Sequence, residues 1–308
     1  MQFLSIGANG KCTDDIMEFI ANELKQLKND NIDYSIDKVN IDGTESIICK
    51  INNDNNQGQG KKVSKQAYRA LMLNVSNALA DYIMRCYEEK ITKRIINSNY
   101  FYFSQAERKD ILKSAFKVIR NEDKSFINTL LQIRRRNIIV KKLMDYFDCS
   151  NSIILDGFVN FRLKDYIKAL EEIVEKAVDN YLMEKEYKEF ITLLKYFVDI
   201  QEPKFLNIHI VVDENGQYML LDEKKKEITN ECIAEYMSEI SEGEISYDDL
   251  LVSSLITLAP KRVTIHGVER FKNKELIETI KSIFSKNIAL CKGCKLCNIN
   301  DTIKNLEK

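Results

Sequence analysis

The 308-residue chain has no tryptophan, only two prolines and only two histidines, His209 and His266. Two histidines are too few for a multi-histidine metal enzyme or for the H-E-x-x-H motif of zinc proteases. No G-x-S-x-G stretch is present, so a nucleophile elbow of the esterase type is unsupported. The scarcity of proline favours a helix-rich chain with few rigid turns. These absences leave no recognisable catalytic apparatus, and we expect a protein that is not an enzyme.

The chain also lacks long hydrophobic runs and an excess of charge of one sign. Its start, MQFLSIGANG, has no basic segment followed by a long apolar stretch, which argues against a cleaved signal peptide. The uncharged run at residues 250–260 is too short to cross a bilayer. We therefore expect a soluble, cytoplasmic protein without a membrane partner. The formal net charge of -1 gives no support to nucleic-acid binding through an overall field.

Periodicity predicts an α+β protein that is predominantly helical. Short strands at residues 2–6, 32–41 and 45–51, with a helix between the first two, indicate a small N-terminal mixed sheet. Asp42-Gly43 is typical of a hairpin turn. The polar stretch at residues 52–62 predicts a linker, and residues 63–147 read as helices. In that region Ser104 and Glu107 have the spacing of a capping box.

The C-terminal half predicts a second α+β unit that contains a hairpin. The apolar stripe at residues 161–181 is interrupted by EKEYKE and resumes at residues 190–200, which fits two packed helices or one long bent helix. Strands at residues 205–213 and 217–222 flank Asn215-Gly216, a tight hairpin signal. Helices at 230–240 and 246–259, a strand at 262–267 and a last helix at 273–284 follow, with Ser246 and Asp249 at capping-box spacing. We predict three regions, at residues 1–60, 61–152 and 153–308.

Three cysteines near the C-terminus, Cys291, Cys294 and Cys297, form the run CKGCKLC. Structural zinc takes four sulfur or nitrogen ligands in a tetrahedron, and the glycine inside C-x2-C permits the required tight turn. We predict His266 as the fourth ligand, with Cys232 as the second candidate. An iron–sulfur cluster is the alternative, although the fourth cysteine and the proline of the bacterial ferredoxin pattern are absent. Free thiols or a redox pair are the remaining interpretation.

A basic run on a predicted helix is the other candidate site. Arginine and lysine side chains bind phosphates, and this run supplies Arg134, Arg135, Arg136, Lys141 and Lys142. On this interpretation the chain is a nucleic-acid-binding factor. The preferred interpretation is the solvated face of a helix whose apolar residues point inward, because the charge of the whole chain gives no support to the alternative.

Several strings, in order, carry a family resemblance: DGFVNFRLKDY, EKEYKEFITLLKYFV, DDLLVSSLITLAP, IHG and CKGCKLC. Over residues 154–297, about half the chain, the sequence resembles the YtxC family of sporulation proteins from endospore-forming bacteria. The resemblance implies a soluble bacterial protein associated by name with spore formation, without a settled activity. We therefore expect a structural or interaction protein with an unknown protein partner and a C-terminal zinc knuckle. Nucleic-acid binding, thiol redox chemistry and an iron–sulfur cluster stay open as alternatives.

Overall fold

The computed structural model describes residues 3–8, 12–41, 43–52, 65–212, 218–228 and 246–297. Two small mixed sheets and a majority of helical residues make up these segments, which confirms the predicted α+β, predominantly helical class. The chain divides into two compact units, Met1–Leu182 and Met183–Lys308. The three-part division drawn from the sequence stays a prediction. Among the described residues, no helix is long and apolar enough to span a membrane.

The first unit is built on a four-stranded sheet with the strand order β2-β3-β1-β4. β1 and β2 each pair antiparallel with β3, and β4 pairs parallel with β1. The strands are β1 (Phe3–Gly7), β2 (Tyr34–Ile41), β3 (Thr44–Ile51) and β4 (Ser152–Ile154). The predicted hairpin is confirmed, because β2 and β3 pair up to Ile41 and Thr44 and Gly43 has a φ of 80°. Asp42 of this turn and most of the predicted linker lie outside the described residues.

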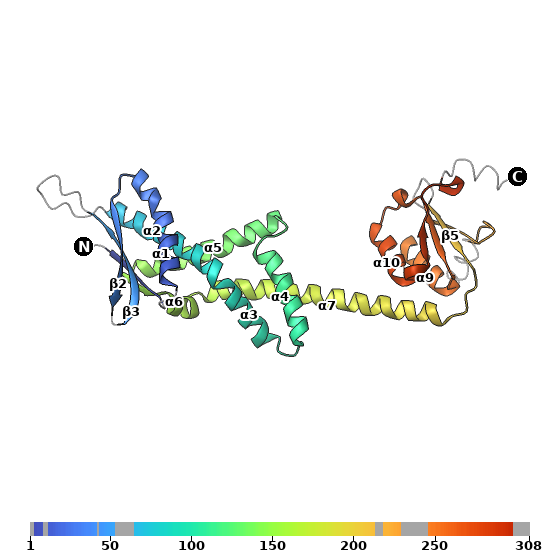
Figure 1. Ribbon diagram of the computed structural model, residues 1–308, viewed down its shortest axis with the longest axis horizontal. Helices are drawn as coiled ribbons and strands as arrows, with labels where there is room; N and C mark the ends of the chain where they lie inside the picture. Colours follow the sequence, from blue (N-terminus) through green and yellow to red (C-terminus); the bar gives the residue numbers. More distant parts are fainter. Residues whose placement is uncertain are drawn as a thin grey trace, which may run out of the picture. The chain divides into compact units, whose positions relative to one another are not determined.

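Helices cover the first sheet and form most of this unit. They are α1 (Thr13–Asn29), α2 (Lys65–Cys86), α3 (Glu88–Asn99), α4 (Gln105–Ile119), α5 (Phe126–Phe147), α6 (Leu155–Arg162) and the first half of α7 (Lys164–Ile200). α1 and α2 lie beside the strands (Figure 1). Ile16, Ile20 and Leu24 recur at helical spacing on α1 and are fully buried with Leu4 and Ile6 of β1 in one core. Burial of each such side chain contributes about 1.5–3 kcal/mol, so this face fixes α1 on the sheet.

The second unit has its own sheet, with the strand order β6-β5-β7-β8. β5 pairs antiparallel with β6 and parallel with β7, and β7 pairs parallel with β8. Its elements are β5 (Ile208–Val212), β6 (Tyr218–Leu221), α9 (Tyr247–Leu258), β7 (Val263–His266), α10 (Lys274–Phe284) and β8 (Ile288–Leu290). The predicted hairpin strands are confirmed as β5 and β6. The Asn215-Gly216 turn and the predicted helix at residues 230–240 lie outside the described residues.

The two faces of the second sheet differ in character, because successive side chains of a strand point to opposite faces. Ile208, Ile210 and Val212 of β5 pack into a core with α9, α10 and the second half of α7. On the opposite face, Val211 and Leu221 pack against Leu296, from the cysteine-rich segment that follows β8. One face therefore holds the helices, and the other receives the C-terminal segment.

Two helices add detail to the sequence predictions. One structure decides between two alternatives, and the other shows a different capping contact. α7 is one continuous 37-residue helix, so the charged stretch EKEYKE does not break it. Ser246 is the N-cap of α9, but its hydroxyl accepts from the backbone N–H of Asp248. Ser246 and Asp249 thus have the predicted spacing, but the hydroxyl of Ser246 accepts from the second helical residue rather than from Asp249, the third. By contrast, Ser104 and Glu107 form the predicted capping box at the start of α4.

Candidate metal centre

Four side chains of the second unit converge on one point. One ligand atom from each of His266, Cys291, Cys294 and Cys297 lies within 4.8 Å of the others. Cys294 Sγ is 3.3 Å and Cys297 Sγ is 3.7 Å from His266 Nδ1, and the two sulfurs are 3.9 Å apart. In a tetrahedral zinc site the sulfur–sulfur edge is about 3.8 Å and the nitrogen–sulfur edge about 3.5 Å, from bond lengths of about 2.3 and 2.0 Å. The separations among His266, Cys294 and Cys297 are therefore close to those that one ion requires, and Cys291 lies within 4.8 Å of the same atoms.

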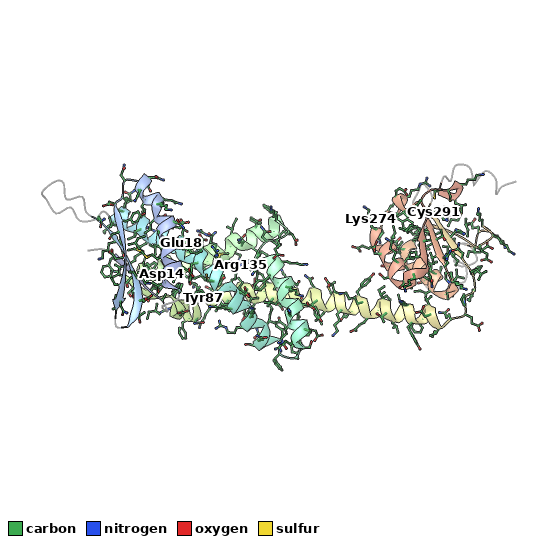
Figure 2. The ribbon with its side chains drawn as sticks, in the orientation of Figure 1. Asp14, Glu18, Tyr87, Arg135, Lys274 and Cys291 are labelled. Carbon is green, nitrogen blue, oxygen red and sulfur yellow. The ribbon has the colours of Figure 1, made fainter. Side chains whose placement is uncertain are left out.

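Strand pairing places the histidine and the first cysteine together. His266 ends β7, and β7 pairs parallel with β8 up to Ile265 and Leu290. The backbone N–H of Cys291 then donates to Ile265 O at 2.8 Å, which continues the ladder and sets Cys291 beside His266. Figure 2 labels Cys291 beside the sheet of the second unit. Residues about 25 positions apart in the sequence thus meet because the last strand joins the sheet.

A tight turn brings in the other two thiols. Gly293 has a φ of 131°, in the region that favours glycine. The backbone N–H of Cys297 donates to Cys294 O at 3.0 Å, which closes a turn over Lys295–Cys297. Leu296, inside this turn, is buried against Val211 and Leu221 and anchors it to the sheet. Gly293, predicted to permit the turn, thus has the positive φ that makes a glycine favourable there.

The electrostatic environment favours ligand-competent forms of these groups. Burial, followed by the nearby His209 and Lys225, lowers the pKa of His266 to about 4, so its imidazole is neutral near pH 7. Burial alone would raise the pKa of Cys294, but hydrogen bonds from the backbone of Leu296, from Cys291 and from the backbone of Cys297 lower it on balance. A neutral imidazole and a stabilised thiolate are the forms that bind transition metals.

The distances between the four ligand atoms distinguish a site for a single ion from a site for an iron–sulfur cluster. Ligands of a single ion cannot lie farther apart than two bond lengths, about 4.6 Å for zinc–sulfur bonds. The ligands of an iron–sulfur cluster bind different iron atoms and are spread more widely. The ligand atoms of His266, Cys294 and Cys297, 3.3–3.9 Å apart, lie within this limit and fit a single ion, and Cys291 lies within 4.8 Å of them. Cys232, the second candidate for the fourth ligand, lies outside the described residues.

His209 contacts this site, although its position in a predicted strand gave no indication of such a role. Its Nδ1 is 3.0 Å from His266 Nε2, and the ring centroids are 5.2 Å apart. Strand alternation puts His209 and Val211 on one face of β5, and Val211 pairs with His266. Only the register between β5 and β7 reveals this contact. The alternation of side chains along a strand could have predicted which face of the sheet His209 occupies, but not its contact with His266.

The five basic residues of α5 do not form one surface. Arg135 is 1% exposed and pairs with Glu88 at 2.9 Å, so it is not accessible to a phosphate. Arg136 forms a two-pronged contact with Asp81, at 2.6 and 3.1 Å. Lys142 pairs with Asp165 at 2.9 Å, whereas Arg134 and Lys141 are exposed. Two cations seven residues apart therefore remain available on this helix, and the nucleic-acid interface stays a prediction.

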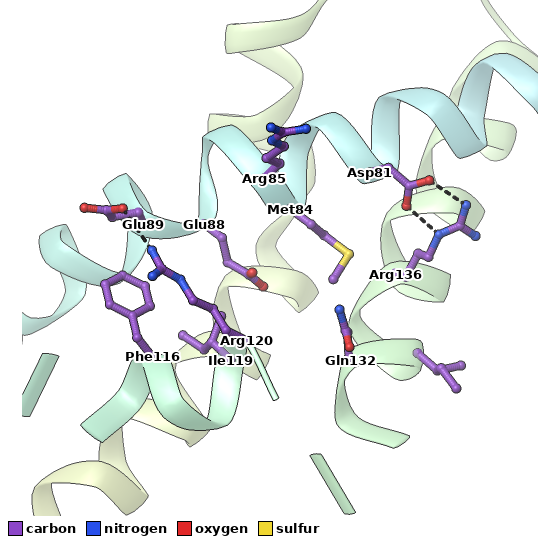
Figure 3. Close-up of a pocket in the computed structure, with 11 residues that line it drawn as sticks. Asp81, Met84, Arg85, Glu88, Glu89, Phe116, Ile119, Arg120, Gln132 and Arg136 are labelled. Carbon is purple, nitrogen blue, oxygen red and sulfur yellow. Dashed lines mark hydrogen bonds and ion pairs between the residues drawn. The ribbon is translucent and has the colours of Figure 1, made fainter. Parts of the chain in front are cut away.

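A cavity lies near this helix, between α2, α3, α4 and α5 (Figure 3). Its volume is about 590 Å³. Arg136 pairs with Asp81 on one side of it, and Arg120 pairs with Glu89 at 3.4 Å on the other. The charges that line the cavity are thus largely compensated within the protein, and they show no preference for a ligand of either sign.

Comparisons with known proteins agree with the resemblance noted in the sequence. The model of the YtxC-like family matches residues 73–289, which include His266 and end just before Cys291. A relative from Bacillus subtilis (strain 168), named "Uncharacterized protein YtxC", is 27% identical over 219 residues, 69% of this chain and 74% of the relative. No solved structure matches the chain. Since the family model covers well over half of the sequence, the chain belongs to the YtxC-like family.

Proposed function

We propose that the second unit is a zinc-stabilised interaction module in a non-catalytic protein that acts in sporulation. The observation that carries the metal part is the convergence of one imidazole and three thiols, whose ligand atoms lie within 4.8 Å of one another. A site with four protein ligands has no open position for substrate or water, which is typical of structural zinc. Metal binding there supplies folding free energy to a segment too short to order itself. The link to sporulation rests on the family resemblance alone.

An exposed apolar face on the second half of α7 supports the interaction part. We call this set the α7 face, and its side chains are 44–67% exposed: Met183, Phe190, Leu193, Tyr196, Phe197 and Ile200. On the same stretch Ile191, Leu194 and Val198 point instead into the core of the second unit. Contiguous exposed apolar residues of this kind mark protein interaction sites. The partner expected from the sequence would cover this face.

Elemental analysis tests the metal part directly. Protein purified without chelator or affinity-tag metal is expected to contain one zinc ion per chain and to be colourless. Cys294→Ser removes one sulfur ligand and should lose the ion, whereas Cys149→Ser, at an exposed cysteine outside the group, should keep it. A brown wild-type protein would indicate iron–sulfur instead. A metal-free wild-type protein with an intact second unit would overturn the zinc site.

Thiol alkylation gives a second readout of the same site. In the zinc-loaded protein Cys291, Cys294 and Cys297 should resist an alkylating reagent, and they should react once a chelator removes the metal. Cys149 is exposed and should react in both states. Cys49 should react in neither, because burial, followed by Asp37, raises the pKa of its thiol to about 12. Equal reactivity of the three C-terminal thiols with and without chelator would contradict zinc binding.

A further inference from the structure

A chain of side-chain contacts leads away from the four proposed ligands across the second sheet. His266 Nε2 faces His209 Nδ1 at 3.0 Å, and His209 Nε2 is 2.9 Å from the amide of Asn207. The hydroxyl of Thr264 donates to Asn207 Oδ1 at 3.1 Å. These hydrogen-bond contacts therefore lead from the side of His266 that faces away from the thiols to Thr264, in the same strand as His266.

The register of β5 and β7 assembles these contacts. Asn207 and His209 lie two residues apart and share one face of the sheet, and His209 pairs with Thr264. Thr264 and His266 occupy the same face of β7. All four side chains are at most partly exposed, and His266 is buried. A buried imidazole is stabilised when both ring nitrogens have partners, and this arrangement provides them.

We propose that His209, held in turn by Asn207 and Thr264, positions the ring of His266 for metal binding through the contact at its Nε2. The proposal rests on the zinc site proposed above. His266 presents Nδ1 to the thiols, so as a metal ligand it must carry its proton on Nε2. That Nε2–H then donates to His209 Nδ1. Hydrogen bonds to the distal nitrogen of a ligating histidine orient the ring and raise its basicity.

Each donor in this series of hydrogen bonds can have an acceptor while all four side chains stay neutral. When His209 accepts at Nδ1, its own proton lies on Nε2 and is donated to the oxygen of the Asn207 amide. The NH2 group of Asn207 then donates to the Thr264 hydroxyl. Rotation of the amide by 180° exchanges its oxygen and nitrogen, so the chain can also run in the opposite direction. In that direction Thr264 donates to Asn207, Asn207 to His209, and His209 to His266, whose Nδ1–H points at Cys294.

The two directions belong to two states of the site. The contact of the Thr264 hydroxyl with Asn207 Oδ1 corresponds to the direction in which Thr264 donates to Asn207. This direction suits a thiolate without metal, because His266 Nδ1–H can donate to the sulfur. The reverse direction frees the Nδ1 lone pair for an ion. His209 thus offers His266 a matched partner in both states, which leucine at this position would not.

Substitution of His209 in the full-length chain tests the proposal. Affinity for Zn²⁺ is measured by competition with a chromophoric chelator for wild type, His209→Leu and His209→Asn. His209→Leu should weaken zinc binding roughly 10- to 100-fold, the usual cost of removing such a partner. The amide oxygen of asparagine lies close to the position of histidine Nδ1, so His209→Asn should restore most of the affinity. Circular dichroism of each variant confirms that the second unit is folded.

Nitrogen-15 spectra of the imidazoles give a readout that a purely structural role would not change. The chain has only two histidines, so the assignment is simple, and His209→Leu leaves one. In the zinc-loaded wild type both rings should carry the proton on Nε2. A proton on His266 Nδ1 in that state, or wild-type zinc affinity in His209→Leu, would overturn the positioning role while leaving the zinc site intact. Failure of wild type to bind zinc at all would overturn both.

Discussion

Arg135 shows how little sequence context alone says about a charged side chain. It stands between Arg134 and Arg136 in a run that suggested phosphate binding, yet it is 1% exposed. Its guanidinium donates to Glu88 and to the backbone oxygen of Ile119, both at 2.9 Å. Burial raises the pKa of Glu88, and Arg135 is the largest influence that opposes this. The pair therefore joins α3 and α5 inside the first unit.

Removal of one partner from this pair should be costly, because the other charge would remain buried and unpaired. We expect Arg135→Met to lower the free energy of unfolding by about 3–5 kcal/mol, as measured by urea denaturation. Arg134→Met is the matched control, since Arg134 is exposed and one position away. Similar midpoints for the two variants would contradict the structural role of Arg135. A larger loss for Arg134→Met would contradict the placement of the helix.

The proposed ligands could be predicted from the sequence because three of them are neighbours in the chain. The spacing CKGCKLC contains its own turn chemistry, and few histidines competed for the fourth place. His209 and Asn207 could not be predicted in this role. Their contacts depend on which strand lies beside β5 and in which register, and those long-range pairings leave no local signal.

Among the elements, those with strong local sequence signals were predicted, and short strands that depend on distant partners were not. The hairpin of β2 and β3 and the capping box of α4 follow from a few adjacent residues, and both are confirmed. β4 and β8 are three-residue strands that exist through parallel pairing with distant partners, and neither was predicted. α7 continues through EKEYKE because alternating acids and bases on one helix attract each other, as Glu184 and Lys188 do.

The capping box gives a test at the start of α4. Ser104 Oγ accepts from the backbone N–H of Glu107, whose carboxylate accepts from the N–H of Ser104 at 2.8 Å. Ser104→Ala should therefore destabilise the protein by about 1 kcal/mol in chemical denaturation. Ser125, the N-cap of α5, makes no capping bond with its side chain, so Ser125→Ala is a matched control with a smaller expected effect. Equal losses for both serines would count against the capping contact.

At the scale of the whole molecule, the α7 face is an apolar surface that stays exposed among the described residues. A two-fold arrangement lets one patch on a protein cover the same patch on a second copy, and such dimers are the commonest oligomers. We expect the purified chain to self-associate through this face. Sedimentation velocity over a range of concentrations should show a dimer for wild type and a monomer for the variant Leu193→Glu.

Thr192→Glu is the control for that experiment, because it adds the same charge to the same stretch of α7 outside the face. It should dimerise as wild type does. A wild-type protein that stays monomeric throughout would rule out self-association. Equal loss of the dimer in Thr192→Glu would show that added negative charge, rather than loss of apolar contact, disrupts association.

The alternation of β5 and β7 between two faces has a consequence for folding fidelity. If β7 slipped by one residue, its inward-facing side chains would turn outward, and His266 would exchange faces with Ile265. The helices would lose their apolar support and the thiols would lose their imidazole in the same step. If the proposed zinc site is correct, metal binding therefore favours the native register of the strands, since only the sheet in that register can bind the ion.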